Sequence, residues 1–212
     1  MLFRFDLPSR IPLFPLTGAV LMPRARIPLH VFEPRYLQML DDTLKTDHRL
    51  IGLIQPEGAE ATGGLAAIGC AGRVVSFSET DDGRQMISLR AISRFRLIEA
   101  KQGFTPYLVG EVDWSSFTRD LRENENDPAM DREALFALLR RYMAAHDLST
   151  DWDAAAEAQD EALINSLSMV LPFSPGDRQA LLESPTLADR RELLQGLIEF
   201  ALHGGDNEER LQ

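Results

Sequence analysis

The chain has 212 residues, of which 44% are hydrophobic and 26% are charged, and its net charge is −11. This apolar content is enough to bury a core and excludes a largely disordered chain, and no apolar run approaches the roughly 18 residues that would indicate a membrane helix. The acidity lies mainly in residues 111–212, which hold 9 basic and 22 acidic side chains. A general attraction to nucleic acid phosphates or to an anionic membrane is therefore disfavoured.

The single cysteine and the N-terminal residues indicate the cellular compartment in which the protein is expected. Cys70 alone cannot build an internal disulfide framework or a multi-cysteine zinc site, and we interpret it as a small buried hydrophobe. Charged residues and a proline interrupt residues 1–10, which lack the apolar segment of a signal peptide. These features predict a soluble, cytoplasmic protein.

The segment that holds the first predicted elements is rich in proline. Five prolines occur in residues 11–36, "IPLFPLTGAVLMPRARIPLHVFEPRY". Each fixes its own φ, lacks an N–H donor and favours an extended residue before it, so this segment is predicted to be extended and kinked and to pair only in short pieces. Glu33-Pro34 then begins a predicted helix that continues through Leu44 and ends near residues 46–48.

Short strands are predicted after this helix. "RLIGLIQP" is a buried strand that ends at Pro56, and Asp82-Gly83 provides the turn of a hairpin between two alternating apolar segments. A third strand is expected at Arg94–Ile98 and a fourth in "PYLVGEVDW" after Pro106. Residues 10–118 are therefore predicted to form a meandering antiparallel sheet that curls upon itself.

The apolar period becomes helical from Asp127 onwards. Asp127 is expected to cap a helix whose first residue is Pro128. A second helix is predicted from Trp152 to Leu171, where Pro172 stops it.

Two capping boxes then predict two further helices. Ser174 with Asp177 opens a short helix, and Thr186 with Asp189 opens a longer one that Gly204-Gly205 should end. The helical part is placed at residues 127–204, with a frayed tail at 205–212. The fold class predicted from the two parts is α+β.

The sequence offers no recognisable catalytic constellation. There is no glycine-rich phosphate loop ending in lysine, no serine-hydrolase elbow and no paired-histidine zinc-protease motif. His30 and Glu33 are spaced three apart in an extended segment, where they would point to opposite sides, so we expect no metal site from them. The prediction is a protein that is not an enzyme and needs no cofactor.

One local cationic cluster is a candidate binding site. Arginines and a histidine lie close in sequence to two aromatic residues, a combination suited to an acidic peptide, a carboxylate or RNA. The alternative is that these arginines are solvated or paired internally. The residues of the cluster are Arg24, Arg26, His30, Phe32, Arg35 and Tyr36.

Several segments, in order, resemble the amino-terminal substrate-recognition domain of the ATP-dependent protease Lon. They are residues 11–36, "LIGLIQ", "GCAGRVVSFSETDDGRQMISLRAISRFRL" and "LPFSPGDRQALLESPTLADRRELLQGLI", and the resemblance extends from about Arg10 to Leu202. It implies a PUA-like β pseudo-barrel followed by a C-terminal helical bundle, together one Lon N-terminal-type unit. It supplies no catalytic residues. Because the chain stops at Gln212, without room for ATPase or protease modules, we expect a free-standing bacterial protein of this family.

The leading hypothesis from the sequence is a non-catalytic polypeptide-recognition or adaptor module. Its expected partners are unfolded or marked polypeptides, together with a protease or chaperone, and self-association into a homodimer is one way to cover an exposed patch. We expect the site in a groove between the sheet and the helices, built from Met22, Arg24, Arg26, Phe32, Arg35 and Tyr36. The alternative function is RNA binding through Arg24, Arg26 and Arg35, and a small-molecule enzyme ranks last.

Overall fold

The structure is a computed structural model that describes residues 7–57, 64–79 and 84–208. The chain forms two compact units. Unit 1 combines the residues up to Glu123 with Phe173–Leu182, and unit 2 combines Asn124–Pro172 with the residues from Glu183 onwards. The sequence had placed residues 127–204 together in one helical part, whereas the structure assigns the short segment Phe173–Leu182 to the unit that contains the sheet.

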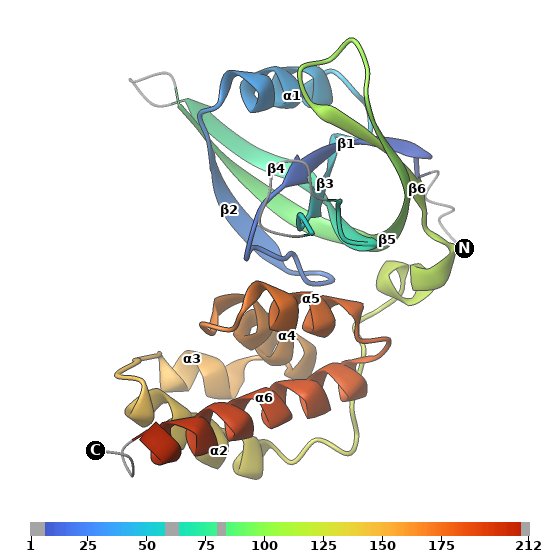
Figure 1. The fold of residues 1–212 in the computed structure, drawn as a ribbon. Helices are drawn as coiled ribbons and strands as arrows, with labels where there is room; N and C mark the ends of the chain where they lie inside the picture. The colour runs from blue at the N-terminus through green and yellow to red at the C-terminus, as the bar shows by residue number, and fades with distance from the viewer. Residues whose placement is uncertain (1–6, 58–63, 80–83, 209–212) are drawn as a thin grey trace. The chain divides into compact units, whose positions relative to one another are not determined.

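The described part of unit 1 contains one mixed sheet of six strands (Figure 1). Its order is β2-β5-β4-β3-β1-β6, and β6 also pairs with the second half of β5, from Arg96↔Asp113 to Gln102↔Leu108. This additional pairing closes the sheet into a barrel. The strands are β1 (Arg10–Pro15), β2 (Arg26–Val31), β3 (Leu50–Ile54), β4 (Ile68–Glu79), β5 (Gln85–Gln102) and β6 (Leu108–Asp113).

The predicted antiparallel meander is wrong at one place, because β1 and β3 run parallel. A parallel pair needs a crossover, and α1 (Pro34–Leu44) lies in the connection between them. β1 also changes partner along its length: residues 10–12 pair with β6 and residues 13–15 pair with β3. Pro12 stands at this change, where the loss of one N–H is tolerated.

The third predicted strand is the second half of a longer one. β5 runs without a break for 18 residues, so Arg94–Ile98 continues the hairpin strand instead of starting a new one. The long strands β4 and β5 bend at register shifts. One shift lies between Val74 and Ser76 and another between Leu97 and Glu99. The predicted hairpin turn at Asp82-Gly83 lies outside the described residues.

The core of the barrel is apolar and closely packed around three glycines. Ile11, Leu13 and Phe95 are among its completely buried side chains. A Cβ at Gly69 would lie 2.5 Å from the Phe95 ring, and Cβ atoms at Gly52 and Gly110 would lie 2.9 Å and 2.8 Å from Leu13. Glycine is required here by close approach, since a larger residue would overlap the core.

The helix α5 (Pro175–Glu183) is tied to the sheet of unit 1 by hydrogen bonds of two glutamines. Gln55 Nε2 donates to the Pro175 carbonyl at 2.9 Å, and Gln179 Nε2 donates to the Ile68 carbonyl at 3.0 Å. These bonds satisfy polar groups at the side of the barrel. The helical period of residues 175–183 therefore predicts the helix correctly without indicating which part it joins.

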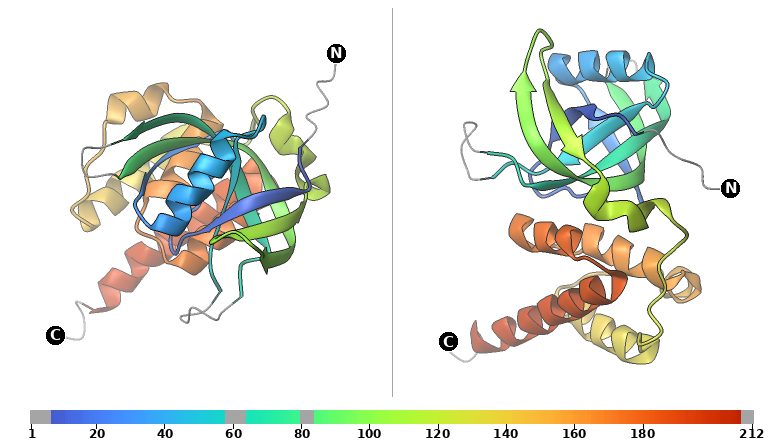
Figure 2. Two further views of the ribbon diagram at one scale, coloured as in Figure 1. Left: turned by 90° about the horizontal axis from the view of Figure 1, so that it is seen from above. Right: turned by 90° about the vertical axis from the view of Figure 1, so that its right-hand side faces the viewer.

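Unit 2 is helical. Its helices are α2 (Arg132–Ala145), α3 (Trp152–Glu157), α4 (Asp160–Val170) and α6 (Leu187–Glu208), and α6 packs against α2 and α4 (Figure 2). The sequence prediction missed three boundaries. The first helix begins at Arg132 with Asp131 as its cap, the second is broken by extended residues at Ala158 and Gln159, and Gly204-Gly205 do not end α6.

Both predicted capping boxes are confirmed by their hydrogen bonds. The Asp177 N–H donates to Ser174 Oγ at 3.1 Å at the start of α5. At the start of α6, the Asp189 N–H donates to Thr186 Oγ1 at 3.2 Å and the Thr186 N–H donates back to the Asp189 carboxylate at 3.1 Å. These local signals depend on residues three apart, which is why sequence alone locates them.

The part of the chain that the structure describes contains neither a membrane-spanning helix nor a cluster of metal-binding side chains. None of the helices there has the length and apolarity needed to cross a bilayer. No group of three or more histidine, cysteine or acidic side chains is placed to hold a metal ion.

Candidate functional site

Two of the six residues predicted to bind peptide are buried. Met22 is completely inaccessible, and Tyr36 is 6% exposed with its ring 4.4 Å from that of Phe14. Burial also raises the pKa of the Tyr36 phenol, an effect that Arg35 partly opposes. Both side chains therefore contribute to packing and present almost no surface to a ligand.

The three predicted arginines have different surroundings. Arg24 has φ of 61°, and its Nη1 donates to the Asp120 carbonyl at 2.9 Å. Arg35 donates from Nε to Glu33 at 3.0 Å, and its guanidinium lies 4.5 Å from the centre of the Tyr36 ring. Arg26 opens β2 and is exposed, with no ion pair to any described residue.

Two of these arginines, Arg26 and Arg35, also lie far apart in the fold. Arg26 stands at the first residue of β2 and Arg35 lies beyond its last residue, so the six-residue strand separates them by about 17–20 Å. Phe32, which follows β2, is 61% exposed. A peptide site built from this cluster stays a prediction, and Phe32 and Arg26 are its most accessible members.

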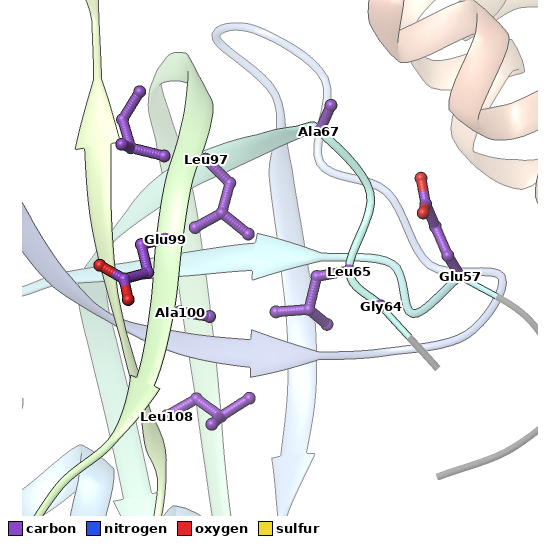
Figure 3. A pocket seen from close by; sticks show the side chains of 9 residues that line it. Glu57, Gly64, Leu65, Ala67, Leu97, Glu99, Ala100 and Leu108 are labelled. Carbon is purple, nitrogen blue, oxygen red and sulfur yellow. The ribbon is translucent and has the colours of Figure 1, made fainter. Parts of the chain in front are cut away.

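A separate open pocket, lined by both apolar and acidic residues, lies on the side of the barrel, and we name it the barrel pocket (Figure 3). Its volume is about 510 Å³. Leu65, Leu97 and Leu108 line it and also pack against the barrel core. The other lining residues are Glu57, Gly64, Ala67, Ile98, Glu99 and Ala100.

The register shift in β5 shapes this pocket. Between Leu97 and Glu99 the pairing with β6 skips one residue, Ile98, whose side chain is left 59% exposed. In Figure 3 the carboxylate of Glu99 points away from the leucines, and Glu57 lies at the other side of the pocket. Glu99 pairs with Lys101 at 2.7 Å. The pocket thus combines an apolar floor with an acidic rim.

Unit 2 has a second pocket of about 490 Å³, which we name the aromatic pocket. The rings of Phe136 and Trp152 lie 6.2 Å apart, and the guanidinium of Arg140 lies 5.0 Å from the Trp152 ring. Arg132 is held in place by an ion pair with Asp160 and a 2.9 Å bond to the Ala156 carbonyl. The site is apolar at its base with cations at its edge.

The fold is that of an α+β protein with a closed β pseudo-barrel and a helical part, the class that the sequence predicts. A comparison with protein families then gives the family. The model of the ATP-dependent protease La (LON) substrate-binding domain matches residues 10–199. The chain belongs to this family, as the resemblance of its motifs indicated.

Individual relatives agree with this assignment. The chain is 26% identical over 201 residues to Lon protease 1 of Bdellovibrio bacteriovorus and 25% identical over 206 residues to Lon protease 2 of Myxococcus xanthus, covering 90% and 91% of this chain. In both comparisons the match covers 24% of the relative. The chain thus spans about a quarter of the length of these curated relatives.

Solved structures share the fold. A Lon N-terminal domain protein from Xanthomonas campestris is 28% identical, with a TM-score of 0.62 over 89% of this chain and 98% of that one. The N-terminal domain of Mycobacterium avium complex Lon protease has a TM-score of 0.60 at 14% identity, over 90% of this chain and 98% of that one, and shows the fold alone.

Sequence reasoning missed the barrel pocket. Its leucines come from β5, from β6 and from the segment before β4, and each belongs to an ordinary apolar strand pattern. The position of the register shift at Ile98 decides which of them meet. No signal in the sequence marks that shift, although alternation failing at "RLIEA" is consistent with it.

Proposed function

We propose that this chain is a non-catalytic polypeptide-recognition module that binds exposed apolar segments at the barrel pocket. The observation that carries the proposal is an open pocket with an apolar floor, with Ile98 exposed at its edge, in a member of a substrate-binding domain family. Concave apolar surfaces are the usual place for ligand side chains in proteins. A pocket of this size accommodates one or two large apolar side chains.

The carboxylates at the rim of the barrel pocket add a charge preference to the binding of apolar segments. Glu57 is exposed, and Glu99 is also exposed beside its partner Lys101. Carboxylates around an apolar pocket favour clients whose apolar residues are flanked by lysine or arginine. The same proposal includes an adaptor role, in which the bound polypeptide is delivered to a protease or chaperone, and membership of a substrate-binding domain family supports it.

An anisotropy measurement with a fluorescently labelled, reduced and carboxymethylated test protein, which stays unfolded, tests this function. Ile98→Lys places a charge at the pocket edge without entering the core, and we expect the dissociation constant to rise about tenfold. The matched control is Phe200→Lys, which also puts a lysine in place of an exposed apolar side chain, at a residue 78% exposed on α6. Equal affinities of the two variants would contradict the proposed site.

A further inference from the structure

Three arginines from three neighbouring strands lie side by side in unit 1. Arg26 of β2 is directly opposite Arg90 of β5, and Arg90 is directly opposite Arg73 of β4. Residues opposite one another in an antiparallel pair point to the same face, with Cβ atoms about 4.5–5.5 Å apart. We name these three residues the arginine row. The ribbon that carries them, β2-β5-β4, is seen in Figure 1.

On the same face, the two paired positions of β2, β5 and β4 that follow the arginine row hold no acidic residue. These positions alternate with the buried residues Ile87 and Leu89, which point to the opposite face. Hydroxyl groups and a histidine accompany the arginines there. The residues are Pro28, Ser88 and Ser76 in one row and His30, Met86 and Ser78 in the next.

The arginines of the arginine row have no ion-pair partner among the residues that the structure describes. Arg26 and Arg90 are exposed, and none of the three forms an ion pair or side-chain hydrogen bond there. Arg73 is half-buried, and its Nε is inaccessible and makes no hydrogen bond. Burial, and after it the charge of Arg73, lowers the pKa of His48, an effect that the carboxylate of Asp47 partly opposes.

Without a bound anion, the arginine row lowers the stability of the folded protein. Like charges directly opposite in a sheet destabilise the pairing, and a half-buried guanidinium without a partner loses hydration without gaining a hydrogen bond. A bound anion would remove both costs. Three adjacent guanidiniums offer two-pronged hydrogen bonding, which matches the planar geometry of carboxylates.

We propose that the arginine row binds the carboxylates of an acidic polypeptide segment, such as a run of aspartate and glutamate. This inference rests on the proposed function, because it assigns to a polypeptide client a second contact with different chemistry. The barrel pocket would receive an apolar part of the client and the arginine row an acidic part.

RNA is the polyanion that fits this face less well. Single-stranded RNA binding relies on large aromatic side chains on which successive bases stack, and the nine paired positions of this face contain no phenylalanine, tyrosine or tryptophan. Residues 111–212, with 9 basic and 22 acidic side chains, would repel a long polyanion. A short acidic peptide requires neither stacking nor an extended basic surface.

The test is the binding of a labelled 12-residue peptide rich in aspartate and glutamate, with its asparagine and glutamine analogue as the neutral probe. In the triple variant Arg26→Gln/Arg73→Gln/Arg90→Gln we expect affinity for the acidic peptide to fall about tenfold or more. The matched control removes three other exposed arginines, Arg119→Gln/Arg122→Gln/Arg141→Gln, and should change it less than about twofold.

Folding is checked on the same variants. Because repulsion within the arginine row is relieved, the triple variant should unfold at a temperature equal to or above that of the unmodified chain. Equal loss of affinity in the triple variant and the control, or equal binding of the acidic and neutral peptides, would overturn the proposal. Strong binding of a uridine oligonucleotide that only the triple variant loses would overturn it in favour of RNA.

The unfolded test protein separates this inference from the proposed function. If the triple variant binds that protein normally but the acidic peptide never binds, the arginine row fails while the barrel pocket stands. If Ile98→Lys leaves the binding of the unfolded protein unchanged, the proposed function fails independently of the arginine row.

Discussion

At the scale of single residues, the most constrained group in unit 1 is the buried ion pair of Arg94 and Asp120. Asp120 accepts from Arg94 Nε, Nη2 and the Arg94 N–H, each at 2.9 Å, and Arg94 Nη1 donates to the Leu182 carbonyl at 3.0 Å. Both side chains are inaccessible. A buried pair of this kind contributes modestly when intact, but removal of one partner leaves a buried charge and costs about 3–5 kcal/mol.

Tyr107 gives a prediction of pH dependence. Its hydroxyl donates to Asp42 at 2.9 Å, and burial, followed by this bond to a carboxylate, raises its pKa from 10.0 to about 12. The protonated phenol is therefore favoured in the folded state. Below pH 10 both states keep the proton and the stabilisation is fully present, whereas between pH 10 and 12 the unfolded chain ionises first and the stabilisation is lost.

Urea unfolding and absorbance at 295 nm measure this effect. We expect the free energy of unfolding to fall from pH 10 to pH 11, and the variant Tyr107→Phe to reduce the steepness of that fall. Burial also raises the pKa values of Tyr36 and Tyr142, so the folded chain should show less phenolate at pH 10 than the urea-unfolded chain. Equal phenolate in the two states would contradict the assignment.

Residue roles are the part that the sequence predicts least well. Met22 and Tyr36 have side chains that suit a ligand surface and a core equally, and only the closed barrel decides that they pack inside. Arg26, Arg90 and Arg73 are 17 or more residues apart along the chain, and the strand register alone aligns them. A local pattern cannot carry that information.

At the scale of elements, the strands cross the barrel core so closely that Gly69 is indispensable. A Cβ there would meet the Phe95 ring at 2.5 Å and the Leu53 carbonyl at 2.7 Å, and the carbonyl belongs to the backbone and cannot turn aside. We expect Gly69→Ala to destabilise unit 1 by about 1–3 kcal/mol in urea unfolding, as overpacking does.

The matched control for this variant is Gly103→Ala. Gly103 follows β5, has no other atom within 4 Å of the added carbon, and should change stability by less than about 0.5 kcal/mol. A Gly69→Ala chain as stable as the control would mean that β4 and β5 do not approach as described.

Elements with local signals are predicted well from the sequence. The capping boxes at Ser174 and Thr186, and the helix start at Pro34, depend on neighbours three residues apart or on proline chemistry. The parallel pairing of β1 with β3 and the length of β5 depend on distant partners, and both were missed. Asp127 accepts from the Ala129 N–H at 3.1 Å and pairs through its other oxygen with Arg191 at 2.6 Å, but the turn that it caps does not continue as a helix.

At the scale of the whole molecule, the division into units makes the predicted boundary at residue 118 testable. A fragment of residues 10–118 lacks Asp120 and α5, and so leaves Arg94 buried without its partner and Gln55 without the Pro175 carbonyl. We expect this fragment to show no cooperative unfolding transition, in contrast to the whole chain, by circular dichroism and by amide NMR spectra.

A well-dispersed amide spectrum of the 10–118 fragment would show the opposite, that the barrel folds without the helix α5. The pattern of apolar residues predicts a β part followed by a helical part, and both are found. It does not predict that Phe173–Leu182 leaves the helical part, because the same apolar face can pack on a sheet or on helices.

Amide hydrogen exchange of the whole chain, with and without the unfolded test protein, shows whether the barrel pocket receives polypeptide. We expect slower exchange at residues 64–67, 97–100 and 108 in the presence of the polypeptide. Slower exchange confined to residues 22–36, with none at the barrel pocket, would contradict this expectation and favour the cluster around Phe32.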